Sequence, residues 1–145
     1  MVTKFREGLR YLAGIIAGAV FLVSLGFEAF CTTNGCRSSV DVLLVGWFGL
    51  LSGGAGICWL ANPMIIIGLI LTFKGSKYSV IFSALATALC FSFLLFDQVI
   101  EDEAGHYREI ISYQAGYWLW CSSAVLLFIN NIVFRKAAVL TNNAE

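Results

Sequence analysis

Charged residues are scarce in this chain, and histidine and proline occur only once each. Of 145 residues, 12% are charged and 59% are hydrophobic, and the mean hydropathy is +0.85. A soluble domain of this size could not cover so much apolar surface, so we expect a membrane protein. The sequence contains no Pro-rich or Gly/Ser-rich linker and no internal repeat, which predicts a single transmembrane domain over residues 1–145.

Several sequence features of enzymes are missing as well. The chain has no phosphate-binding glycine loop, no catalytic triad candidate and no string of carboxylates inside its apolar runs. Lysine and arginine stand at the ends of the apolar runs, which is typical of membrane topology and gives no reason to expect nucleic-acid binding. We therefore expect a protein that is not an enzyme, has no cofactor and has the lipid bilayer as its first partner.

The apolar runs predict an all-α membrane protein, an up-down-up-down bundle of four transmembrane helices. The second run is unusually long, because a straight helix of its length would reach roughly 48 Å across a hydrocarbon core of about 30 Å. Pro63 lacks a backbone donor, and a residue before proline disfavours the helical conformation, so we expect a kink near Asn62-Pro63. The four predicted spans are residues 11–30, 42–73, 78–96 and 117–134.

Charge is distributed unevenly between the ends of these spans. With four spans, seven basic residues share the side of both termini: Lys4, Arg6, Arg10, Lys74, Lys77, Arg135 and Lys136. Most acidic residues fall on the opposite side. The positive-inside rule then predicts a multi-pass protein of a bacterial inner membrane with both termini in the cytoplasm.

Glycines are regularly spaced in the first two spans. Small residues three or four apart share a helix face and allow a neighbouring helix to approach closely. We expect the glycine face of the second span to pack against the first span, although glycine is also frequent in membrane helices in general. The residues are Gly14 and Gly18 in the first span and Gly46, Gly49, Gly53 and Gly56 in the second.

Cys31 and Cys36 lie in a polar loop with an Asn34-Gly35 turn signal on the predicted outer side. An oxidising compartment favours a structural disulfide between them. The alternative is a redox pair. Four spans, cytoplasmic termini and a cysteine pair followed by Arg37 resemble the DsbB-like quinone-linked thiol oxidases. The spacing here is C-x4-C rather than C-x-x-C, and residues 97–114 contain no second pair, so the oxidase is kept as an alternative.

Three polar sets are further candidates. Glu28, near the outer end of the first span, is expected to form a structural ion pair with Arg37. If the acidic loop is helical, the carboxylates and imidazole of Glu103, His106 and Glu109 share a face that suits a divalent metal, the alternative being a solvated acidic loop. Ile110, Ile111 and Tyr113 suggest a short helix at the interface.

In the fourth span, Asn130 and Asn131 are expected to bond across helices, to the carbonyls that Pro63 frees.

These features predict a protein that works by helix-mediated association with a protein partner or as a homo-oligomer. It would be an accessory subunit or an immunity-type protein, since its size and layout resemble the small multi-span immunity proteins against pore-forming bacteriocins. The alternatives are the DsbB-like oxidoreductase and a small homo-oligomeric channel or transporter. A channel would need a polar lining, for which the candidates are Ser79, Ser83, Thr87, Asn130 and Asn131.

Overall fold

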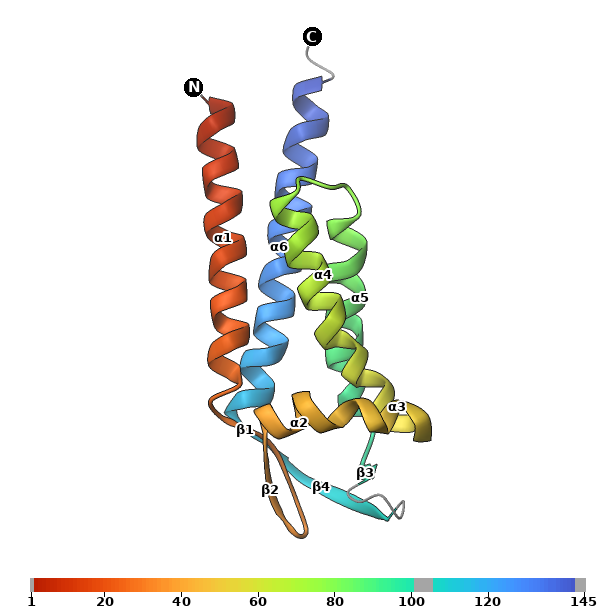
Figure 1. The fold of residues 1–145 in the computed structure, drawn as a ribbon. Helices are drawn as coiled ribbons and strands as arrows, with labels where there is room; N and C mark the ends of the chain where they lie inside the picture. Colours follow the sequence, from red (N-terminus) through yellow and green to blue (C-terminus); the bar gives the residue numbers. More distant parts are fainter. Residues whose placement is uncertain (1, 101–105, 143–145) are drawn as a thin grey trace.

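Four helices run side by side in the computed structural model, which describes residues 2–100 and 106–142 (Figure 1). Helix α1 contacts α6 and α4, while α5 packs between α4 and α6, so the four helices close into a ring. The start of α1 and the end of α6 lie at one end of this bundle, and a sheet lies at the other (Figure 1). The helices are α1 (Val2–Ser24), α4 (Ala61–Phe73), α5 (Ser79–Ser92) and α6 (Ala115–Asn142).

The segments that link the helices at the far end form a four-stranded antiparallel sheet in the order β2-β1-β4-β3. A hairpin joins β1 to β2, and Cys31 pairs with Cys36 in its register. Strand β1 also pairs with β4, which brings the residues after α1 next to those before α6. The strands are β1 (Glu28–Thr32), β2 (Gly35–Ser38), β3 (Gln98–Ile100) and β4 (Tyr107–Tyr113).

Between the sheet and α4 the chain forms a folded-back helical segment, residues 39–60, which we call the arm. It runs outward, reverses at Gly53 and Gly54, and returns to α4. Figure 1 shows α2 and α3 lying across the lower end of the bundle rather than along it. The arm consists of α2 (Ser39–Val45), η1 (Gly46–Phe48), α3 (Gly49–Ser52) and η2 (Gly54–Leu60), the η segments being 3-10 helices.

The prediction of an all-α bundle of four transmembrane helices is wrong. Among the described residues, three helical segments are long and apolar enough to cross a membrane: Phe5–Ser24, Gly54–Phe73 and Ala115–Phe134. The predicted span 42–73 is not one kinked helix, because Gly53 and Gly54 take positive φ values of 74° and 57° that reverse the chain before Pro63 is reached. The predicted outer loops are largely strands, so the fold is mixed rather than all-α.

Helix α4 ends where a glycine cap stops it. Gly75 has φ 69°, its N–H bonds to the carbonyl of Thr72, and the N–H of Ser76 bonds to the carbonyl of Leu71. This pattern is the Schellman motif, in which a left-handed glycine satisfies the last free carbonyls of a helix. It turns the chain at once into α5, whose apolar run Ser79–Leu95 includes the short 3-10 helix η3 (Phe93–Leu95).

Candidate functional site

A pocket of about 820 Å³ lies where the arm, the sheet, the end of α1 and the start of α6 meet, and we call it the cap pocket. Its lining comes from segments far apart in the sequence, from Ser24 at the end of α1 to Trp120 in the second turn of α6. Most of the lining is apolar, for example Phe30, Val42 and Val99. Two exposed residues of opposite charge, Arg37 and Asp41, also line it. The pocket therefore offers an apolar body with charged groups at its edge.

The arm holds its shape through direct contact between its own glycines. A Cβ on Gly49 would lie 3.1 Å from the Cα of Gly56, and a Cβ on Gly56 would overlap the backbone of Gly49. Any larger side chain at Gly56 would push the outgoing and returning halves of the arm apart. The predicted glycine face thus serves close packing, but within the arm rather than against α1.

Gly14 and Gly18 of α1 do face the second predicted span, but they meet its helical second half. A Cβ on Gly14 would contact the ring of Phe73 at 3.5 Å, and one on Gly18 would contact Leu69 at 3.6 Å. Gly53 has nothing within 4 Å of a built Cβ. Its role is conformational, since its φ of 74° and ψ of −154° belong to a region that is essentially reserved for glycine.

Trp59 joins the two halves of the arm. Its indole Nε1 donates to the carbonyl of Leu43 at 3.0 Å, and its ring fills the space beside Gly46, where a Cβ would lie 2.6 Å from the indole Cδ1. Only glycine at position 46 leaves room for this ring. The returning half of the arm is thereby fixed to the outgoing half at a second point.

Asn62 secures the junction between the arm and α4. Pro63 has no N–H to give to the carbonyl of Trp59, four residues earlier, and the Nδ2 of Asn62 donates to that carbonyl at 3.0 Å instead. The other amide atom, Oδ1, accepts a hydrogen bond of 2.9 Å from Nε1 of Trp120 in α6. The Asn62 side chain is 6% exposed, and both its amide nitrogen and its amide oxygen are hydrogen-bonded, as is usual for buried polar groups.

The base of the sheet is closed tightly against the start of α6. A Cβ on Gly116 would lie 2.6 Å from the carbonyl oxygen of Glu28 and would overlap Oγ of Ser39. The N–H of Ser39 donates to the carbonyl of Phe27 at 3.0 Å, while its buried Oγ has no hydrogen-bond partner within the described part of the chain. Ser38 starts α2 by accepting the N–H of Asp41 on its side chain.

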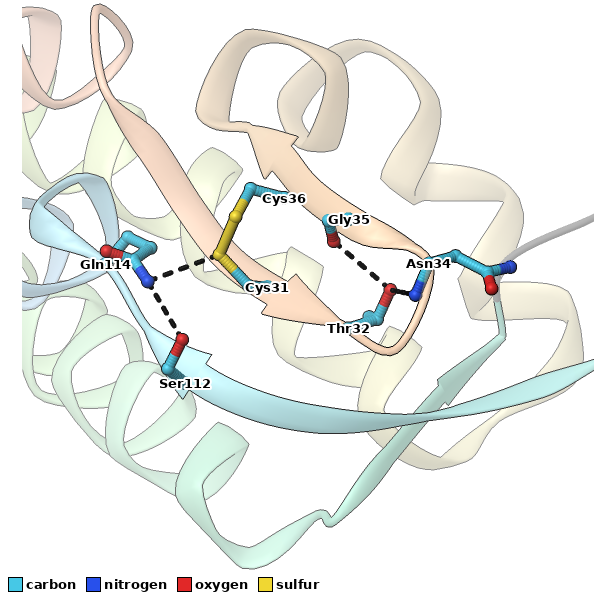
Figure 2. Close-up of a disulfide and its surroundings, with 7 residues drawn as sticks. All are labelled: Cys31, Thr32, Asn34, Gly35, Cys36, Ser112 and Gln114. Carbon is cyan, nitrogen blue, oxygen red and sulfur yellow. Dashed lines mark hydrogen bonds between the residues drawn. A yellow bond between two sulfur atoms is a disulfide. The ribbon is translucent and has the colours of Figure 1, made fainter.

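Cys31 and Cys36 form the expected disulfide across the β1–β2 hairpin. Cys31 is buried in the interior strand, whereas Cys36 is exposed on the edge strand. Figure 2 shows the amide of Gln114 reaching both Sγ of Cys31, at 3.2 Å, and Oγ of Ser112, at 2.8 Å. The two sulfur atoms and a carboxylate oxygen of Glu28 all lie within 4.8 Å of one another. The disulfide is therefore set in an asymmetric polar environment.

Apart from those in the third and fourth spans, the remaining polar residues singled out in the sequence are placed in strands, beside a strand or outside the described residues. Glu28 pairs with Ser38 in the sheet register and Arg37 pairs with Phe30, so the Glu28–Arg37 ion pair stays a prediction. Residues 107–113 form a strand, which corrects both the helical face expected for Glu109 and the interface helix expected around Tyr113. Of the proposed metal ligands, Glu103 lies outside the described residues and His106 directly precedes β4.

Asn131 is the polar centre of the helical bundle, far from the cap pocket. Its Oδ1 accepts from Oγ1 of Thr72 at 2.8 Å, and its Nδ2 donates to Oγ of Ser83 at 3.2 Å and to the carbonyl of Ser79 at 3.3 Å. One side chain of α6 thus ties together α4 and α5. The neighbouring Asn130 donates to the carbonyl of Arg10 in α1. Both asparagines bond across helices, but neither meets a carbonyl freed by Pro63.

The indole bonds of Trp59 and Trp120 to the arm and to Asn62 were missed from the sequence. All four tryptophans of the chain, Trp47, Trp59, Trp118 and Trp120, lie in the arm or in the first two turns of α6. In the sequence only Trp118 and Trp120 stand close together, and such a pair is typical of the aromatic belt at a membrane interface. The sequence signal for the contacts around Asn62 was the Asn62-Pro63 dipeptide, because a proline inside an apolar helix requires another hydrogen-bond donor nearby.

No protein-family model, curated protein sequence or solved structure matches this chain.

Proposed function

We propose that this chain is a multi-pass membrane protein that works by binding a ligand, and that the cap pocket takes an amphipathic molecule, most simply a zwitterionic phospholipid. The observation that carries the proposal is the pocket itself. Its volume of about 820 Å³ falls in the range of roughly 300–1,000 Å³ that small-molecule sites occupy. Its apolar lining suits acyl chains, while Arg37 and Asp41 suit a phosphate and an ammonium group.

The surroundings of the pocket support entry from a bilayer. The arm contains no charged residue beyond Asp41, and outside the pocket lining it carries the large exposed apolar side chains of Leu44, Trp47 and Ile57. Such a surface is stable in lipid, and tryptophan favours the headgroup level of a membrane. The cap pocket would then lie at that level, where the headgroup and the first part of the chains of a lipid meet.

The proposal includes an orientation in a bacterial inner membrane. Arg6, Arg10, Lys74 and Lys77 are at the end of the bundle that holds the start of α1 and the α4–α5 turn. The positive-inside rule assigns that end to the cytoplasm. The sheet, the disulfide and the cap pocket then face the periplasm, where a disulfide is maintained.

Ligand binding is tested by native mass spectrometry of the full chain released from mild detergent, with lipid extraction in parallel. We expect one retained phospholipid per chain. Ala55→Phe, which adds a ring at the pocket wall, should reduce the retained lipid several-fold. Ala19→Phe is the matched control, because Ala19 is exposed on α1 outside the pocket lining, and it should retain lipid normally. Equal retention by both variants, or none by the wild type, would contradict the proposal.

Helix-mediated association, the function expected from the sequence, is the competing outcome of the same measurement. It predicts a protein partner or a second copy of the chain in the spectrum, and no loss of that mass in Ala55→Phe. The two outcomes differ in the mass retained, so one experiment separates them.

A further inference from the structure

We propose that the Cys31–Cys36 disulfide is a site of directed thiol–disulfide exchange, in which an incoming thiol of neutral or positive charge attacks Cys36 and Cys31 leaves. This chemistry does not depend on a ligand in the cap pocket, because neither Cys31 nor Cys36 is among the residues that line it. The inference rests on three features of the disulfide surroundings: the exposure of the two cysteines, the hydrogen bond to one sulfur, and the nearby carboxylate.

Access to the two sulfurs is unequal. Cys36 belongs to β2, the edge strand of the sheet, and is exposed, whereas Cys31 belongs to β1, has a strand on each side and is 9% exposed. Exchange requires a thiolate to approach along the S–S axis and attack one sulfur. The attacked atom is therefore Sγ of Cys36.

The leaving sulfur is the one that the structure is prepared to stabilise. Nε2 of Gln114 donates to Sγ of Cys31 at 3.2 Å, and this amide is held in place by a second bond to Ser112 and by the Gln114 backbone N–H, which donates to the carbonyl of Ala29. A donor to a sulfur favours its thiolate form, and a thiol of lower pKa leaves faster. Gln114 also directly precedes α6, a helix of 28 residues, and the positive end of a helix dipole acts in the same direction.

Glu28 sets the charge of the preferred attacker. Its carboxylate lies within 4.8 Å of both sulfurs, so it repels an anionic thiol and attracts a cationic one. Arg37, which follows Cys36 in sequence and carries the opposite charge, lines the cap pocket. The carboxylate of Glu28 is therefore a charged group that the structure places within reach of both sulfurs.

The exchange balances without any further oxidant. A thiolate of an external dithiol attacks Sγ of Cys36, the S–S bond breaks, and its electron pair leaves on Sγ of Cys31. The second thiolate of the dithiol then attacks its own sulfur in the mixed disulfide and releases Cys36 as a thiolate. The external dithiol becomes a disulfide, the protein pair becomes two thiols, and the two protons of the dithiol pass to them.

The test uses the full chain in nanodiscs with its disulfide intact and two monothiol probes, cysteamine and glutathione, at equal thiolate concentration. Free thiols are trapped with N-ethylmaleimide and the peptides are mapped by mass spectrometry. We expect the mixed disulfide on Cys36 and the maleimide on Cys31, with at least about tenfold preference, and faster reaction with cysteamine. An adduct on Cys31, an even mixture, or no reaction of the folded protein would overturn the proposal.

Variants separate the contributions. Gln114→Leu should slow exchange about two- to tenfold, the range expected for loss of one hydrogen bond, without moving the adduct. Ser112→Ala keeps the donor on Cys31 and should change the rate less. Glu28→Gln should accelerate glutathione more than cysteamine; equal acceleration would contradict the charge argument.

A second measurement does not depend on an intact disulfide. In Cys36→Ser, the rate of Cys31 alkylation against pH gives the pKa of the Cys31 thiol. Adding Gln114→Leu should raise it, and an unchanged pKa would overturn the role of the amide.

Discussion

The indole Nε1 of Trp120 donates a hydrogen bond of 2.9 Å to Oδ1 of Asn62. This bond joins α6 to the junction of the arm and α4, two segments that lie 58 residues apart in sequence. Nδ2 of Asn62 donates to the carbonyl of Trp59, to which Pro63 cannot donate, so the same side-chain amide makes one local and one long-range hydrogen bond.

Trp120→Phe keeps most of the ring volume but removes the donor, and so leaves Oδ1 of Asn62 buried without its partner. We expect the free energy of unfolding to fall by about 1–3 kcal/mol, the cost of an unsatisfied buried polar group. Trp118→Phe is the control, because the Trp118 side chain is 49% exposed. Both can be measured by unfolding in mixed SDS micelles, and equal effects would contradict the role of the bond.

Asn131→Leu removes three hydrogen bonds from α6 to α4 and α5. Each interhelical bond in a membrane protein contributes about 0.6–2 kcal/mol, so we expect a loss of about 2–4 kcal/mol, although the Ser83 hydroxyl keeps its bond to the carbonyl of Ser79. Ser122→Ala should be nearly neutral, because the exposed Ser122 hydroxyl donates to the carbonyl of Trp118 in its own helix. The same SDS titration gives both values.

Gly53→Ala tests the reversal of the arm. With φ 74° and ψ −154°, alanine there should cost about 1–3 kcal/mol of backbone strain although nothing lies within 4 Å of its Cβ. Gly8→Ala makes the same chemical change in α1, also with nothing within 4 Å, and should stabilise the helix by up to about 1 kcal/mol. If Gly53→Ala were as harmless as Gly8→Ala, the described reversal would be wrong.

Orientation can be read from the labelling of single introduced cysteines. In intact bacterial cells a membrane-impermeant maleimide should label Glu109→Cys, on exposed β4, but not Ser76→Cys, in the α4–α5 turn. Ser76→Cys should label only after permeabilisation. The native Cys58, Cys90 and Cys121 are free but buried, so the unmodified chain provides the background. Labelling of Ser76→Cys in intact cells would reverse the proposed orientation.

The helices α1, α5 and α6 could be predicted because each is a continuous apolar run with polar ends. The arm could not, since an apolar run rich in glycine has the same composition whether it continues or reverses. Gly49 and Gly56 satisfy a helix-face spacing and a hairpin contact equally well, and only the positive φ of Gly53 and Gly54 decides between them.

The sheet was missed for a related reason. The Cys31–Cys36 pairing was predicted from its turn, but a hairpin of that length gives no sign that β4 will pair with it from 80 residues away. The composition around Ile110, Ile111 and Tyr113 suits an interface helix, but these residues belong to β4, which pairs with β1. The cap pocket was beyond reach because its walls come from segments that only the complete fold brings together.

The pairing of β1 with β4 has a consequence for how the chain is made. Helix α1 is synthesised before α6, yet its most extensive contacts are with α6, and the strand that follows α1 pairs with the strand that precedes α6. Contacts between distant parts of a chain form slowly, because a long loop must close first. During translation α1 is therefore made without its principal neighbour, and the cap pocket is completed only after α6 has been synthesised.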